Sequence, residues 1–111
     1  MKSKSLTLFL VALATFLPAI ASAGEFRGTL TKDGAPVRGA VIKIKITSGN
    51  NAPHMATTDR SGFYRVFVPE IGSGTLTVTI DQKEFPALTV TSYDRFVQND
   101  LIVKGEEVTK R

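Results

Sequence analysis

Apolar and polar residues alternate along most of the chain after residue 24, which is the pattern of half-buried β-strands. In the segment 40–47 (AVIKIKIT), every second residue from Ala40 onward is apolar and two lysines lie between these positions. Residues 75–80 (TLTVTI) repeat the pattern. No apolar period of 3.6 residues continues over three turns, so the sequence predicts an all-β fold.

Turn residues divide this part of the chain into short strands at intervals of about ten residues, a spacing typical of β-sandwiches. The seven predicted strands cover residues 25–31, 40–47, 55–58, 63–68, 75–80, 84–91 and 94–104. Two sheets with one apolar face each would bury these faces against each other. We therefore expect a single seven-stranded, Ig-like β-sandwich at residues 24–104 and a flexible charged tail at residues 105–111.

The first 23 residues have the three parts of a secretory signal peptide. Lys2 and Lys4 form a basic start, residues 6–17 (LTLFLVALATFL) are apolar, and Ala21 and Ala23 provide small residues for cleavage. The apolar run is too short to span a bilayer, so we expect cleavage after Ala23 and no membrane span in the mature chain. This predicts an exported protein, periplasmic or secreted, with a leader of bacterial style. Loss of the two lysines would lower the formal charge from +4 to +2.

Two turn motifs resemble the carboxypeptidase regulatory-like domain family. The first is Asp33-Gly34-Ala35-Pro36-Val37-Arg38-Gly39-Ala40-Val41 and the second is Thr57-Thr58-Asp59-Arg60-Ser61-Gly62-Phe63-Tyr64, with Gly28 before them and Val68-Pro69 after them. The last part departs from the family pattern, because Gly72 follows Pro69 by three residues instead of two. The resemblance implies a transthyretin-like (prealbumin-like) β-sandwich and covers nearly all of residues 24–104.

The residues of these motifs also have local structural roles. Gly34 can adopt the left-handed conformation of a tight turn, and Pro36 stiffens the chain after it. The Asp59 carboxylate can accept backbone N–H groups within its own turn, and Tyr64 is expected to enter the core. The predicted structural turn residues are Asp33, Gly34, Pro36, Gly39, Asp59, Gly62 and Tyr64.

The residue types that carry most enzymatic chemistry are scarce. The chain has no cysteine and one histidine, His54, whereas a metal site needs three or four convergent ligands. Asp59, Asp81 and Asp94 lie in predicted turns, where turn closure accounts for them. The basic residues are scattered among strands and turns and form no contiguous footprint for nucleic acid. We therefore expect no enzymatic activity, no cofactor, no metal and no nucleic-acid partner.

Two surfaces remain as candidates for binding. One is the polar loop that includes Asn50, Asn51 and His54, and the other is the face of residues 63–68 that carries Phe63, Arg65 and Phe67. Exposed aromatic and arginine side chains can stack on sugar rings or anchor a protein partner, although this face could instead be buried against the second sheet. The sequence thus favours an exported, non-enzymatic binding or accessory module that recognises a protein or glycan at the cell envelope. The alternative is a structural or self-assembling envelope protein that uses an exposed edge strand near Pro86 or residues 94–104.

Overall fold

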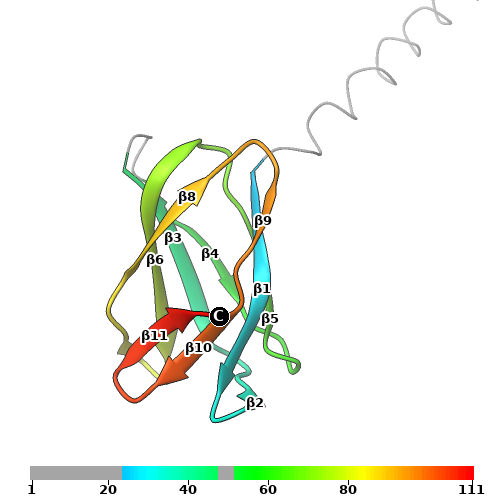
Figure 1. Cartoon of the computed structure of the whole chain (residues 1–111), viewed down its shortest axis with the longest axis vertical. Helices are drawn as coiled ribbons and strands as arrows, with labels where there is room; N and C mark the ends of the chain where they lie inside the picture. Colours follow the sequence, from blue (N-terminus) through cyan, green and yellow to red (C-terminus); the bar gives the residue numbers. More distant parts are fainter. Residues whose placement is uncertain (1–23, 48–51) are drawn as a thin grey trace, which may run out of the picture.

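The computed structural model describes residues 24–47 and 52–111, which form two β-sheets that lie face to face (Figure 1). The first, the β1 sheet, has the order β11 (Glu107–Lys110), β10 (Leu101–Lys104), β1 (Glu25–Lys32) and β2 (Ala35–Pro36), and β5 (Phe63–Phe67) and β9 (Phe96–Gln98) also pair with β1. The second, the β6 sheet, has the order β4 (His54–Thr57), β3 (Val41–Ile46), β6 (Gly72–Ile80) and β7 (Lys83–Glu84), and β8 (Leu88–Ser92) also pairs with β6. The predicted all-β architecture is confirmed.

The described residues contain eleven strands where seven were predicted. The predicted strand 84–91 is divided around Pro86, which cannot donate a backbone hydrogen bond to the ladder. The predicted strand 94–104 is also divided, and the short strands β2 and β11 add to the number. The predicted leader, residues 1–23, lies outside the described residues. No helix able to cross a membrane occurs in the described part of the chain.

The core lies between the two sheets and follows the predicted alternation. In and next to β3, Ala40, Ile42, Ile44 and Ile46 are buried, whereas Lys45 between them is exposed. In β6, Leu76 and Val78 are buried as expected, and Ile80 is only half-buried at the strand end. Sixteen hydrophobic residues form this one core cluster, from Phe26 on β1 to Val108 on β11. Burial of this apolar surface is the main force that holds the sheets together.

Strand β1 organises its sheet because four other strands pair along its length. Its first half lies between β5 and β9, and its second half pairs with β10 and β2. Strands β9 and β10 run parallel to β1 in one unbroken register, with Phe96 opposite Glu25 and Leu101 opposite Leu30. The predicted strand 94–104 thus exists as a single track with an interruption at residues 99 and 100.

A glycine on β1 explains this interruption. The carbonyl oxygen of Asn99 lies where the side chain of Gly28 would be, because a Cβ there would come within 2.0 Å of it. Tyr64 lies opposite Gly28 on β5, and its hydroxyl donates a 2.5 Å hydrogen bond to the same Asn99 oxygen. Asp100 then accepts the backbone N–H of Thr29 through its carboxylate at 3.0 Å. The missing side chain of Gly28 therefore lets one tyrosine connect β5 with the β9–β10 track across β1.

The two turn motifs of the sequence meet at one end of the molecule. The buried Thr58 hydroxyl accepts the Ala40 N–H at 2.9 Å and donates to the Val37 carbonyl at 2.6 Å. The Asp59 carboxylate accepts the backbone N–H groups of Ser61 and Phe63, which is the turn closure that the sequence predicted. The second motif thus holds the connection that leads into β3.

Positive φ angles occur where the turn residues were expected. Asp33 and Gly34 form the tight turn between β1 and β2 with φ of 54° and 79°. Gly39 and Gly62 also have positive φ, and a Cβ on Gly62 would meet the Leu30 carbonyl oxygen at 2.5 Å. Both the backbone conformation and the close approach favour glycine at position 62.

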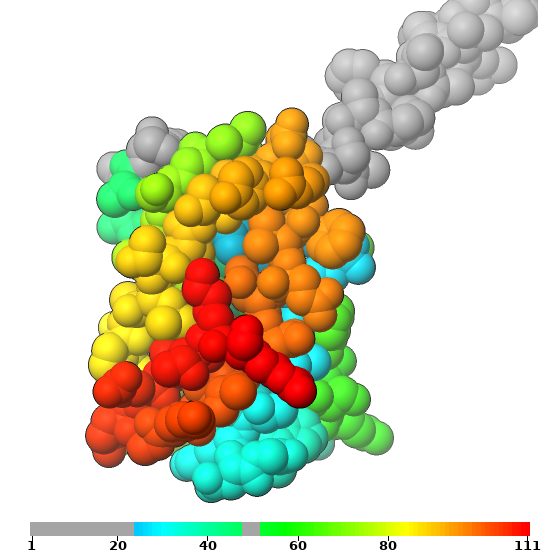
Figure 2. Space-filling view, viewed as in Figure 1, coloured from blue at the N-terminus to red at the C-terminus, as the bar shows by residue number. Residues whose placement is uncertain are grey.

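The expectation of a loose tail is wrong for the C-terminal residues. Residues 107–110 form β11, which pairs antiparallel with β10 and buries Val108. Lys83 on β7 donates a 2.5 Å hydrogen bond to Glu106, so the turn before β11 also contacts the β6 sheet. Figure 2 shows this C-terminal segment, in red, lying across the side of the molecule where the two sheets meet. A single buried valine between charged residues gave too weak a pattern to predict this strand.

We predict that Tyr64→Phe lowers the free energy of unfolding by about 1–3 kcal/mol, because the part-buried Asn99 carbonyl would lose the tyrosine that donates to it. Denaturant unfolding followed by circular dichroism measures this change. Tyr93→Phe is the matched control, since Tyr93 is exposed and its change should stay within about 0.5 kcal/mol. Equal unfolding midpoints for Tyr64→Phe and the wild type would contradict the assigned role.

Candidate functional site

The three residues singled out on β5 lie on the outer face of the β1 sheet. Tyr64 and Val66 are buried, so the alternation of the strand turns Phe63, Arg65 and Phe67 outward. The exposed fractions of Phe63 and Phe67 are 39% and 52%. Burial against the second sheet, the alternative considered for this face, is therefore excluded.

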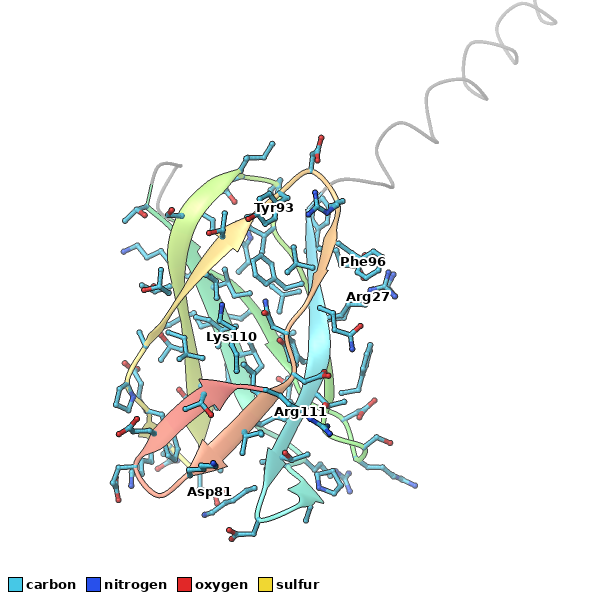
Figure 3. All side chains as sticks on the ribbon, viewed as in Figure 1. Arg27, Asp81, Tyr93, Phe96, Lys110 and Arg111 are labelled. Carbon is cyan, nitrogen blue, oxygen red and sulfur yellow. The ribbon has the colours of Figure 1, made fainter. Side chains whose placement is uncertain are left out.

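The strand register adds residues from two other strands to this face. On β1, Glu25 lies opposite Phe67 of β5, and Arg27 lies opposite Arg65 of β5. On the other side of β1, Phe96 of β9 lies opposite Glu25 and is half exposed. Figure 3 shows Arg27 and Phe96 side by side, directed away from the sandwich. We call the set Glu25, Arg27, Phe63, Arg65, Phe67 and Phe96 the phenylalanine–arginine face.

One carboxylate organises the two arginines of this face. Like charges directly opposite each other in a sheet repel, and Arg27 and Arg65 are such a pair. Glu25 compensates, because its Oε2 lies 2.6 Å from Nε of Arg65 and 3.3 Å from Nε of Arg27. The Glu25 side chain is only 17% exposed, so this contact is partly shielded from water.

Arg27 is also held by an aromatic ring. Its guanidinium carbon lies 4.0 Å from the centre of the Phe96 ring, a cation–π contact. Its Nε is buried and has no hydrogen-bond partner among the described residues, although Glu25 lies nearby. The face therefore presents aromatic rings around two positioned cationic groups on a rigid sheet.

His54, the described residue of the other predicted surface, is not part of the phenylalanine–arginine face. His54 begins β4 in the β6 sheet, and its Nε2 lies 2.7 Å from Oε1 of Glu70. The backbone N–H of Glu70 itself, and next the His54 ring, hold the pKa of Glu70 below its ordinary value. Asn50 and Asn51 lie outside the described residues.

The predicted turn residues take part in contacts within the fold. Asp33, Gly34, Pro36, Gly39, Asp59 and Gly62 belong to the two turn motifs that contact each other through Thr58 and Leu30. Tyr64 is in the core, and its burial, together with the charge of Asp100, raises its pKa above the ordinary value. Residues 24–47 and 52–111 contain neither a pocket nor a group of three or more potential metal ligands.

Sequence reasoning missed Glu25, Arg27 and Phe96 as members of the face. Alternation alone places them outward, since Phe26 and Val97 are on the inner side of their strands. What the sequence does not contain is the order of the strands in the sheet. Only the pairing of β1 with both β5 and β9 brings the three phenylalanines around the arginines.

No protein-family model matches the chain, and no curated protein matches it.

We predict that Glu70→Gln destabilises the protein at neutral pH and that the difference from the wild type shrinks as the pH falls below the ordinary carboxyl pKa of 4.5. The pKa of Glu70 is lower in the folded protein than its ordinary value of 4.5. The ionised carboxylate therefore stabilises the fold fully at pH values above 4.5, and this contribution is lost as the pH falls through the pKa of the folded protein. Unfolding by denaturant at a series of pH values measures the difference. It should be smaller in a His54→Asn background, and a difference that does not depend on pH would contradict the prediction.

Proposed function

We propose that the chain is an exported, non-enzymatic binding or accessory module that recognises a protein or glycan at the cell envelope through the phenylalanine–arginine face. The observation that carries the proposal is the exposure of three phenylalanines around two arginines held by Glu25. Aromatic residues, phenylalanine included, and arginine are enriched at protein interfaces. Their strands are fixed by the core, so little ordering would accompany binding.

The remaining parts of the proposal rest on the sequence. Residues 1–23 have the pattern of a signal peptide, which supports a bacterial periplasmic or secreted location. The two turn motifs support a transthyretin-like sandwich of the carboxypeptidase regulatory-like family. In such a fold, function is set by the exposed face or loops of the individual protein and not by the sandwich itself.

A structural role through strand addition is the second candidate. Strand β10 is not available for it, since β11 pairs along its free side. Among the described strands, β9 pairs only with β1, so the edge of β9 that points away from β1 is open. Phe96 of the phenylalanine–arginine face lies on this strand. An open edge of this kind can accept a strand from another subunit. Size measured over a range of concentrations separates this role from binding, because a strict monomer excludes self-assembly.

We predict that the paired change Phe67→Ala and Phe96→Ala reduces capture of the natural partner at least about tenfold, because two exposed anchor side chains are removed. Cross-linked pull-down from the native compartment, with a glycan array in parallel, measures capture. Met55→Ala is the matched control, because Met55 is an equally exposed apolar residue on β4 of the other sheet. Equal capture by the paired variant and the control would refute the phenylalanine–arginine face as the binding site.

A further inference from the structure

We infer that the phenylalanine–arginine face binds an extended, acidic segment of a partner protein in which one carboxylate side chain lies between two apolar side chains. This inference rests on the proposed function and names the chemistry of its ligand. Its basis is the order of side chains along β5, the unmatched positive charge of the face, and the way in which Glu25 holds the arginines.

The order along β5 is apolar, cationic, apolar. Phe63, Arg65 and Phe67 are at alternate positions of one strand and turn to the same side. Alternate residues of a strand are about 6.8 Å apart. A partner segment in extended conformation has the same repeat, so an apolar–x–acidic–x–apolar sequence would place each of its side chains against one of these three.

The charge of the face favours an acidic partner. Two guanidinium groups share one carboxylate, which leaves one positive charge unmatched. Glu25 contacts both arginines through their Nε atoms, and within the described residues no hydrogen bond engages their terminal nitrogens. Arg65 remains 66% exposed at its side chain. Its planar fork is suited to two parallel hydrogen bonds with an incoming carboxylate.

The same residues are less suited to other ligands. A sugar needs acceptors as well as donors for its hydroxyl groups, but the one carboxylate of the face is nearly covered and already bound. Arg27 occupies one side of the Phe96 ring, which reduces the area on which a sugar could stack. A second copy of the chain would bring two faces of the same sign together. A protein segment with negative charge and apolar side chains satisfies both the rings and the arginines.

The test uses a synthetic peptide, Thr-Phe-Thr-Glu-Thr-Phe-Thr with blocked ends, titrated into the exported protein by calorimetry or fluorescence anisotropy. Two further peptides replace Glu by Gln or both Phe by Ser. We expect the first peptide to bind and each replacement to weaken binding by roughly tenfold. Raised salt should weaken the two peptides that contain Glu and leave the Gln peptide nearly unchanged. Equal binding of the Glu and Gln peptides, or no binding at about millimolar peptide, would overturn the inference.

A double-mutant cycle locates the contact. Arg65→Ala should weaken the Glu peptide by roughly tenfold and leave the Gln peptide nearly unchanged, because the two changes remove the same interaction. Lys45→Ala is the matched control, since Lys45 is an exposed cation on β3 of the other sheet and its loss should change neither affinity. Independent, additive effects of Arg65→Ala and the Glu→Gln replacement would also overturn the inference.

The outcomes of the two binding experiments can be told apart. Binding only to a neutral oligosaccharide, or only to vesicles of phosphatidylglycerol, would overturn the acidic segment as ligand. If capture of the natural partner still depends on Phe67 and Phe96 in that case, the binding face itself stands. If capture does not depend on these residues, the proposed function fails, whatever the peptides do.

Discussion

The hydrogen bond from the Tyr64 hydroxyl to the Asn99 carbonyl, made across Gly28, is the contact on which the β1 sheet depends. It joins the strands on the two sides of β1 through the core, at the one position of β1 where no side chain separates them. Losing this bond is costly, because its donor Tyr64 is buried in the core and the contact itself is partly shielded from water. At the same interruption, the carboxylate of Asp100 accepts a hydrogen bond from the backbone N–H of Thr29. Few polar contacts thus fix the position of β9 beside β1.

The outer face of the sheet follows from this inner contact. Residues alternate along β1, so the strand that offers Phe26, Gly28 and Leu30 to the core offers Glu25 and Arg27 to the outside. The same connection that places β5 and β9 on either side of β1 places their phenylalanines on either side of Glu25. The proposed binding surface and the core contact are two sides of one arrangement.

The sequence was sufficient for the local features and insufficient for the pairing of distant strands. Alternation at residues 40–47 and the turn chemistry of Asp33-Gly34 and Asp59 are local, and the structure has them as predicted. The spacing around Tyr64 put Phe63, Arg65 and Phe67 together on the opposite face of their strand, but it left open whether that face was exposed or buried against the second sheet. The face as a whole could not be predicted, because Phe96 is brought there by pairing between residues far apart in the chain. Strand β11 was missed since its burial depends on Val108 alone.

The most direct test of this crossing is a double-mutant cycle of Gly28→Ala with Tyr64→Phe, in which the free energy of unfolding of each variant is measured. A methyl group at position 28 would displace the Asn99 carbonyl, so Gly28→Ala alone should cost about 1–3 kcal/mol. Because the displaced carbonyl no longer meets the tyrosine, Tyr64→Phe should cost clearly less in the Gly28→Ala background than in the wild type, with a coupling of at least about 0.5 kcal/mol. A neutral Gly28→Ala change, or costs that simply add, would contradict the central role of this crossing.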